Sequence, residues 1–127
     1  MNIVVLSRNA SLYSTQSIVE AAKKRGHNVR VLDHMFCDLI IDTFDPCIFY
    51  NFQKLDNVDA IIPRIGTMAT AIGSSVIRQF EKMGVFSTLS PEPLLKTRNK
   101  LSCLQHLAAE GVLVPRTAIT NNLYTLS

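Results

Sequence analysis

The stretch at residues 59–67, Asp-Ala-Ile-Ile-Pro-Arg-Ile-Gly-Thr, constrains the fold of this chain most strongly. Residues 60–62 are apolar and rich in isoleucine, which is typical of a strand that helices bury on both faces. Pro63 has no backbone N–H, so we expect the strand to end there. Arg64 then stands at the carboxyl end of a central strand, where ligands bind in open α/β sheets. Alternatively, Arg64 pairs with a nearby acid or faces water.

Strands and helices alternate on both sides of this stretch. Residues 3–6, Ile-Val-Val-Leu, predict a first buried strand, and a polar loop at residues 7–14 leads into a helix that Gly26 ends. Residues 29–32 predict the second strand. A strand, a helix and a strand within about thirty residues indicate a right-handed parallel unit.

The middle of the chain repeats this order after an interruption. We expect residues 34–57 to form an extended excursion or a small hairpin over the sheet edge. A helix over residues 69–83 ends at Gly84 and leads into a fourth strand at residues 85–88. The predicted fold of residues 1–89 is therefore a parallel, doubly wound, Rossmann-like α/β domain with three layers, α/β/α.

Residues 90–115 predict a helical linker. Residues 90–92, Ser-Pro-Glu, combine an N-cap, a proline at the first helical position and an acid in the first turn, so a short helix should run through Leu95. A second helix is predicted over residues 97–110 and is closed by Gly111.

Residues 116–120 alternate like a strand but have no partner left in the sequence. An unpaired strand exposes backbone groups that favour pairing with another chain. We therefore expect residues 116–127 to be the start of a truncated further domain, either disordered or paired with a second copy of the chain.

Charge and composition limit the partners. The net charge is +3, and the 13 lysines and arginines are spread along the chain. Such a mild excess suits an anionic small ligand or an acidic peptide and argues against nucleic acid. No apolar run can span a bilayer and no signal peptide is visible, so we expect a soluble, cytoplasmic protein without a membrane partner. The three cysteines form no CxxC pair and the three histidines are scattered, which argues against a metal site.

The loop after the first strand places Arg8 and three serines at a helix N-terminus. Free N–H groups and the helix dipole favour an anion at such a junction. The alternative is that Ser11 or Ser14 only caps the helix. The loop contains neither the dinucleotide nor the P-loop glycine motif, so we interpret Asp33 as a turn residue and not as a ribose ligand.

Lys100 lies within the apolar stripe of the second linker helix. It precedes Leu104 by four residues and Leu107 by seven, which places the amine on the same helix face. Either its stem reaches out to water or its ammonium has an anionic partner.

Several stretches resemble one enzyme family. Residues 2–8, 21–27, 59–67 and 78–81 resemble the N-terminal part of RimK, an ATP-grasp ligase that adds glutamate to the C-terminus of a small-subunit ribosomal protein. Lys100 and the later Leu104, Leu107, Gly111 and Val-Pro-Arg-Thr at residues 114–117 are similar to the linker of ATP-grasp enzymes generally. The resemblance runs from Met1 to about Thr120.

This resemblance implies a pre-ATP-grasp domain joined by its linker to an ATP-grasp module. The whole enzyme would be a carboxylate–amine ligase that uses ATP and magnesium and proceeds through an acylphosphate. Lys100 matches the family's first nucleotide-contacting lysine. Arg64 and Arg8 are inferred, from position and charge, to bind the acidic C-terminal peptide of the acceptor.

The remaining ATP-grasp parts would follow Ser127: the second lysine, the loop over the phosphates and the metal-binding side chains. We therefore expect residues 1–127 alone to bind no cofactor and to be inactive as a ligase. The alternative is a stand-alone, non-catalytic α/β module that binds an acidic peptide, a small anion or a partner chain. A flavodoxin-like nucleotide binder is disfavoured because the first loop contains no glycine.

Overall fold

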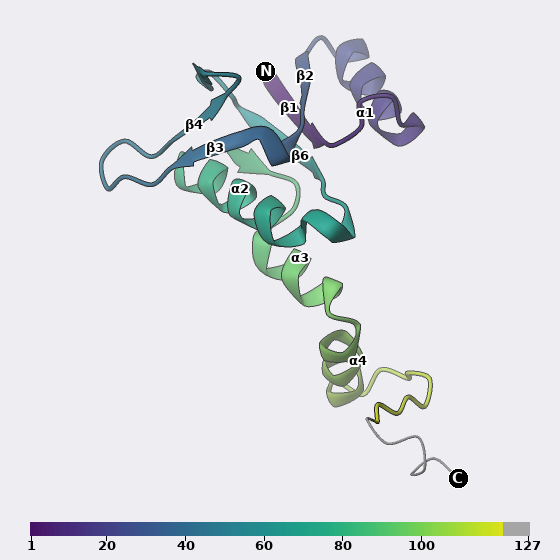
Figure 1. The fold of residues 1–127 in the computed structure, drawn as a ribbon. Coiled ribbons are helices and arrows are strands. Elements are labelled where there is room, and N and C mark those ends of the chain that lie inside the picture. Colours follow the sequence, from purple (N-terminus) through teal and green to yellow (C-terminus); the bar gives the residue numbers. More distant parts are fainter. Residues whose placement is uncertain (121–127) are drawn as a thin grey trace.

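The computed structural model describes residues 1–120 of the chain. At its centre is a parallel sheet with the strand order β2 (Asn28–Leu32), β1 (Asn2–Ser7), β6 (Ala60–Arg64) and β7 (Phe86–Ser87) (Figure 1). The central strand β1 pairs with β2 on one side and with β6 on the other. This order confirms the predicted parallel α/β domain.

Helices cover both faces of the sheet. The crossover through α1 (Tyr13–Lys24) and the crossover through α2 (Thr70–Lys82) run in opposite directions from the centre of the sheet, so their helices lie on opposite faces (Figure 1). On the α1 face, Ala22 packs with Ile3 and Ala60. The α2 face holds the larger core, and its buried members include Val4, Leu6, Ile61, Val76, Ile77 and Phe80. The doubly wound, three-layer prediction is therefore confirmed.

The prediction that Pro63 ends its strand is wrong. Strand β6 runs on to Arg64, and both residues still pair with β1. The N–H of Thr88 donates to the Ile61 carbonyl at 3.3 Å, so the backbone groups of Ile61, and by alternation those of Pro63, point toward β7. Because β7 has already ended at that level, the missing N–H of Pro63 removes no ladder hydrogen bond.

The excursion between β2 and β6 folds as a small antiparallel sheet, as expected. A 3-10 turn, η1 (His34–Phe36), leads into β3 (Cys37–Ile40), β4 (Cys47–Tyr50) and β5 (Gln53–Lys54). This hairpin sheet packs against α2, and its buried Ile48 belongs to the α2-face core. It therefore completes one layer of the domain.

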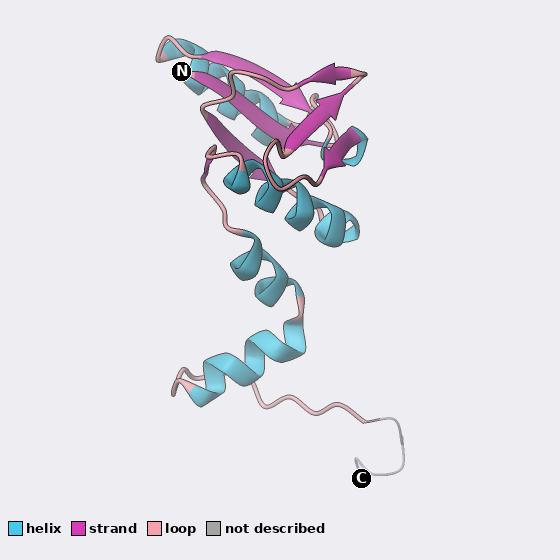
Figure 2. Cartoon of the chain, turned by 90° about the vertical axis from the view of Figure 1, so that its left-hand side faces the viewer, coloured by secondary structure: helices cyan, strands magenta, loops and turns pink. Residues whose placement is uncertain are grey.

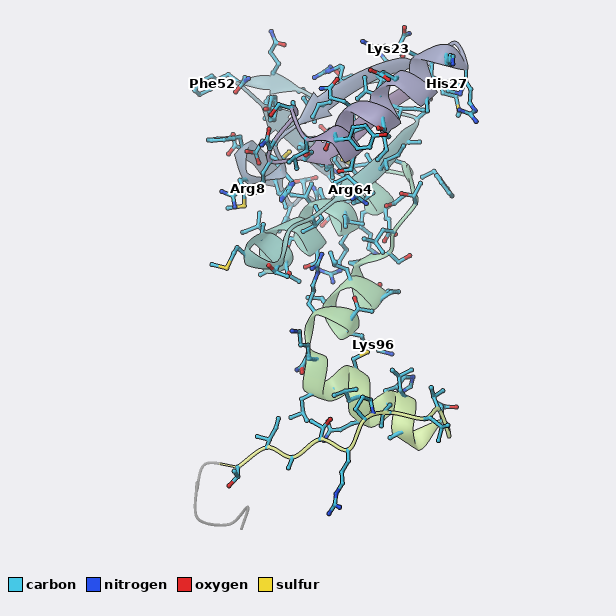
Figure 3. All side chains as sticks on the ribbon, turned by 90° about the vertical axis from the view of Figure 1, so that its right-hand side faces the viewer. Arg8, Lys23, His27, Phe52, Arg64 and Lys96 are labelled. Carbon is cyan, nitrogen blue, oxygen red and sulfur yellow. The ribbon has the colours of Figure 1, made fainter. Side chains whose placement is uncertain are left out.

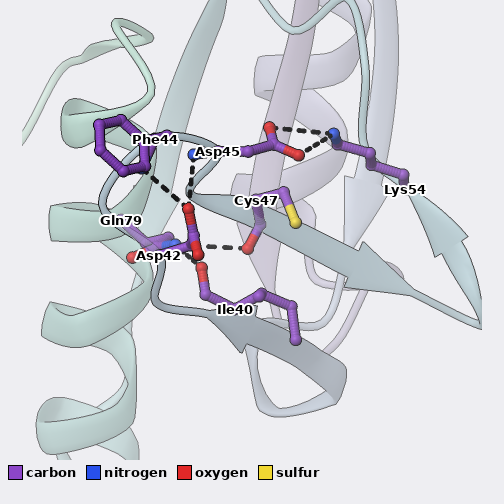
Figure 4. A network of polar contacts seen from close by, with 7 residues as sticks. All are labelled: Ile40, Asp42, Phe44, Asp45, Cys47, Lys54 and Gln79. Atoms are coloured by element: carbon purple, nitrogen blue, oxygen red, sulfur yellow. Dashed lines mark hydrogen bonds and ion pairs between the residues drawn. The ribbon is translucent and has the colours of Figure 1, made fainter.

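One side chain joins α2 to both strands of the hairpin (Figure 4). Gln79 is almost fully buried, and its Nε2 donates to the Ile40 carbonyl at 2.8 Å and to the Cys47 carbonyl at 3.3 Å. The loop between these strands is held by Asp42, whose Oδ1 accepts from the N–H groups of Phe44 and Asp45 at 2.8 and 2.9 Å. The loop end of the β3–β4 hairpin is thus held by hydrogen bonds that do not belong to the sheet.

The linker contains the two predicted helices, α3 (Pro91–Arg98) and α4 (Lys100–Ala109). They are separated at Asn99, whose extended backbone stops α3 and whose side chain caps α4 by accepting from the N–H of Ser102 at 3.0 Å. The second helix therefore begins at Lys100 and not at residue 97. Figure 2 shows α4 extending away from the sheet, and none of its residues is buried.

The predicted strand at residues 116–120 is wrong, because this segment has no strand structure. A strand needs a ladder partner, and no strand among the described residues lies beside it. The other part of the expected truncated domain, residues 121–127, lies outside the described residues. Within residues 1–120, no helix is long and apolar enough to cross a membrane.

Candidate functional site

A pocket of about 300 Å³ opens at the carboxyl edge of the parallel sheet. Its walls come from the end of β1, the start of α1, the turn after β6 and the end of α3. The lining residues are Ser7, Leu12, Ser14, Thr15, Pro63, Arg64, Ile65, Gly66, Leu89 and Arg98. The parallel pairing of β1 with β6 brings these segments together, because the carboxyl ends of parallel strands meet at one edge.

Arg64 lies in this pocket, at the strand end where the sequence placed it. Its backbone pairs with Ser7 of β1, which fixes the direction in which the side chain leaves the sheet. The guanidinium is exposed and has no hydrogen bond or ion pair with any residue in the range 1–120. Among residues 1–120 the structure therefore shows no acid partner for Arg64, whereas the other form of the alternative, a guanidinium that only faces water, stays open.

Arg98 is a second cation of the same pocket, and sequence reasoning missed it. It ends α3, and its Nη2 donates to the carbonyl oxygen of Ile65 at 2.6 Å. This bond joins α3 to the turn after β6. The only available sequence signal was a basic residue in the last turn of a predicted helix, which usually serves the helix's own C-terminus.

The first loop forms its own hydrogen-bond network. The buried Ser7 hydroxyl lies 3.1 Å from that of Thr15 and also donates to the carbonyl of Asn9 at 3.0 Å. Helix α1 begins after Leu12, which offers no side-chain cap. Ser11 instead donates its N–H and its hydroxyl to the Asn9 side chain. The prediction that Ser11 or Ser14 caps the helix is therefore wrong, and the first-turn N–H groups keep no side-chain cap.

Arg8 follows the lining residue Ser7 in the chain but is not itself in the lining of this pocket. Figure 3 shows Arg8 and Arg64 at a similar height in the view, with Lys96 well below them toward α4. Arg8 acts electrostatically on His34, which follows β2 at the same sheet edge. Burial lowers the pKa of His34, Arg8 lowers it further, and Asp33 opposes both effects.

The environment of His34 explains this shift. Its side chain is fully buried, and neither ring nitrogen has a hydrogen-bond partner within residues 1–120. Burial without a partner disfavours the charged imidazolium. The neighbouring Asp33 accepts from the N–H of Met35 at 2.9 Å, so its predicted role as a turn residue is confirmed.

Lys100 is not brought together with the two arginines of the pocket. It is the first residue of α4, it is exposed, and its ammonium has no hydrogen bond or ion pair with any of residues 1–120. The apolar stripe beside it is not buried either, since Leu101 and Leu107 are 41% and 36% exposed. The expectation of an amine inside a buried stripe is therefore wrong for this chain.

Potential metal ligands do not gather in the part of the chain that the structure describes. No group of three or more histidine, cysteine, aspartate or glutamate side chains lies together there. Burial, followed by the charges of Asp33 and Asp38, raises the pKa of the Cys37 thiol to about 12. This thiol is therefore a poor candidate for a metal ligand or a nucleophile.

Comparison with known proteins agrees with this geometry. The family model of the RimK PreATP-grasp domain matches residues 1–94. The chain belongs to the RimK family. Two relatives, each named a probable alpha-L-glutamate ligase, come from Cellvibrio japonicus (46% identity over 124 residues) and Nitrosococcus oceani (47% over 121 residues). The matches cover 98% and 95% of this chain but only 41% and 40% of those proteins, so the chain spans about two fifths of their length.

Solved structures support the fold of this RimK family member. The ATP-grasp ligase PsnB complexed with a minimal precursor is similar with a TM-score of 0.72 and 21% identity, over 98% of this chain and 48% of PsnB. A RimK domain ATP-grasp protein from Sphaerobacter thermophilus has a TM-score of 0.67 and 16% identity, over 91% of this chain and 40% of its own. At these identities the likeness shows a shared pre-ATP-grasp α/β fold.

Proposed function

We propose that this chain is the N-terminal domain of an ATP-dependent glutamate ligase that adds glutamate to the C-terminus of a ribosomal protein. One observation carries the proposal: Arg64 ends a central strand, lines a pocket at the carboxyl edge of the sheet, and has a guanidinium with no partner among residues 1–120. The names of the RimK relatives supply the reaction class. ATP-dependent modification of a ribosomal protein would take place in the cytoplasm.

In this proposal Arg64 and Arg8 bind the acidic C-terminal peptide of the acceptor. A guanidinium offers five N–H donors in a plane and pairs with a carboxylate through two parallel hydrogen bonds. Arg64 is held by strand pairing, whereas Arg8 follows β1 directly at the same sheet edge. The PsnB structure and the macrocyclase MdnC structure both contain a precursor peptide, which supports a peptide substrate.

Lys100 is proposed to contact the nucleotide. Its ammonium is exposed and unpartnered within residues 1–120, so it is free to neutralise phosphate charge. ATP supplies the activation of the acceptor carboxylate when it is bound. Magnesium is proposed for the whole ligase and is assigned to no residue here, because the described residues hold no cluster of metal ligands.

The test uses steady-state kinetics of the complete ligase that contains this domain. Arg64→Ala and Arg8→Ala should raise KM for an acidic acceptor peptide. The loss of a charge-assisted hydrogen bond, about 1.5 to 3 kcal/mol, corresponds to roughly a 10- to 150-fold decrease in kcat/KM. Arg25→Ala is the matched control, because Arg25 follows α1 at the opposite edge of the sheet.

Lys100→Ala should raise KM for ATP and leave acceptor binding unchanged. Unaltered kinetics of Arg64→Ala and Arg8→Ala would remove the acceptor role, and an unchanged nucleotide affinity of Lys100→Ala would remove the nucleotide role. Residues 1–127 alone are expected to show no ligase activity in the same assay.

A further inference from the structure

We propose that the pocket at the ends of β1 and β6 is a carboxylate-binding site in which Arg64 and Arg98 together bind the side-chain carboxylate of a glutamate. Arg98 thereby becomes a second binding residue of the site. The choice of glutamate rests on the proposed function, whereas the specificity for a carboxylate rests on the pocket itself.

The charge of the pocket is the first argument. Its lining residues include two arginines and no aspartate or glutamate. The acid nearest in sequence to Arg98 on α3 is Glu92, and its Oε1 lies 3.7 Å from the guanidinium of Arg78 on α2. Two like charges that share a pocket repel each other, and an anion between them relieves this repulsion.

The fixed position of Arg98 is the second argument. Its hydrogen bond to the Ile65 carbonyl uses one of its five N–H donors and holds the guanidinium against the residue that follows Arg64. Arg64 is fixed independently, because its backbone belongs to the β6 ladder. Two cations on rigid elements reduce the entropy lost when a carboxylate binds between them.

The remaining polar groups also suit an anion. The hydroxyls of Ser7 and Thr15 bond to each other and are therefore occupied. Within residues 1–120, the hydroxyl of Ser14 and the N–H groups of residues 13–15 have no hydrogen-bond partner, and Ser14 lines the pocket. These groups are donors, so the pocket can surround a carboxylate with hydrogen bonds in addition to charge.

The size of the pocket limits the ligand. A volume of about 300 Å³ is at the lower end of small-molecule pockets. It suits one amino acid or one side chain of a peptide. A glutamate carboxylate could therefore come from free glutamate, which is the proposed co-substrate, or from a glutamate residue of the acceptor peptide.

The experiment is an NMR titration of the protein, followed at the backbone amides of Ile65 and Gly66 in the pocket wall. The probes are L-glutamate, a short peptide that ends in two glutamates, and L-glutamine as the control that has the same α-carboxylate but an uncharged side chain. We expect saturable shifts with glutamate, with the peptide or with both, and none with glutamine. Whichever probe saturates the pocket identifies the source of the carboxylate.

Two variants separate binding from folding. Arg64→Lys and Arg98→Lys keep the positive charge but lose the planar pair of donors, so each should weaken binding by about tenfold or more. Arg78→Lys, in which the cation is on α2 and pairs with Glu92, is the matched control and should bind as the wild-type protein does. Thermal unfolding of each variant checks that the domain is folded.

Two results would overturn the proposal: no saturable shift with glutamate or the peptide, or equal binding by the wild-type protein and both lysine variants. Failure here is distinguishable from failure of the proposed ligase function. If the pocket binds no glutamate, the complete enzyme can still be tested for ATP-dependent addition of glutamate. If the pocket binds glutamate but the complete enzyme has no ligase activity, only the proposed reaction fails.

Discussion

Replacing Gln79 by leucine should detach the β3–β4 hairpin from α2. The Gln79 amide donates to the Ile40 carbonyl at 2.8 Å and to the Cys47 carbonyl at 3.3 Å, from a side chain that is only 8% exposed. Leucine has a similar volume and no donor. The variant therefore removes both hydrogen bonds without opening a large cavity.

The size of the effect follows from these two bonds. A neutral hydrogen bond contributes about 0.5 to 1.5 kcal/mol, and a buried acceptor left without a donor costs about 1 to 3 kcal/mol. We therefore expect Gln79→Leu to lower the free energy of unfolding by roughly 2 kcal/mol. For a domain of this size, that corresponds to a decrease in Tm of roughly 8 to 16 °C.

Urea denaturation measures the total loss, and amide hydrogen exchange locates it. Protection should fall most in β3 and β4, whereas β1 and β2, which pair with each other in the separate parallel sheet, should keep theirs. Gln53→Leu is the matched control, because Gln53 lies in β5 and is exposed. It should change stability by less than about 0.5 kcal/mol.

The reasoning would be refuted if Gln79→Leu were as stable as the wild-type protein, or if hydrogen exchange rose uniformly across the sheet. The first result would mean that the two carbonyl groups find other donors at no cost. The second would mean that the hairpin does not open separately from the rest of the domain.

Three further predictions follow from buried groups. Burial lowers the pKa of His34, so near pH 6.5 and below the unfolded chain binds a proton that the folded chain does not. The free energy of unfolding should therefore fall as the pH decreases from 7.5 to 5, and His34→Leu should reduce that fall. Urea denaturation that showed the same pH dependence for His34→Leu and the wild-type protein would contradict this. Because the pKa of Cys37 is raised to about 12, on the order of one thiol in ten thousand is ionised at pH 8. Iodoacetamide should therefore label Cys37 far more slowly in the folded protein than in the unfolded chain. Equal labelling rates of Cys37 in the two states, measured by mass spectrometry, would count against this. A methyl group added at Gly73 would lie closer than contact distance to Cγ2 of Ile65 and 3.0 Å from its Cδ1. Gly73→Ala should therefore lower Tm, and this decrease should be smaller in an Ile65→Ala background. If the effects of the two substitutions on stability simply added, the clash would be excluded.

The main elements of the fold could be predicted because their signals are local. Apolar runs predicted the buried strands, and glycines with positive φ end the helices, as at Gly26 and Gly84. The position of Arg64 at a strand end followed from the same local pattern. Asn99 was missed as a boundary, although its side-chain cap separates α3 from α4.

The errors concern contacts between segments that are distant in the chain. Whether Pro63 can remain in a strand depends on which neighbour its nitrogen faces, and the sequence does not show this. Arg98 reaches the pocket only because α3 packs beside the turn that follows β6. The predicted strand at residues 116–120 required a partner that the described residues do not supply. Periodicity also placed Lys100 in a buried stripe, but α4 packs too little to bury it.

The site roles and the domain limits stay predictions. The acceptor roles of Arg8 and Arg64 and the nucleotide role of Lys100 rest on position, charge and the RimK resemblance. The same holds for the boundaries at residues 89 and 115. The structure adds Arg98 to these candidates and places it with Arg64 in one pocket.

Mass spectrometry of the acceptor tests the central claim most directly. An acidic C-terminal peptide is incubated with glutamate, ATP, magnesium and the complete ligase that contains this domain. We predict successive additions of glutamate that require ATP, that decrease strongly with Arg64→Ala and that remain with Arg25→Ala. An acceptor that gains no glutamate, or gains it equally with Arg64→Ala, would contradict the account.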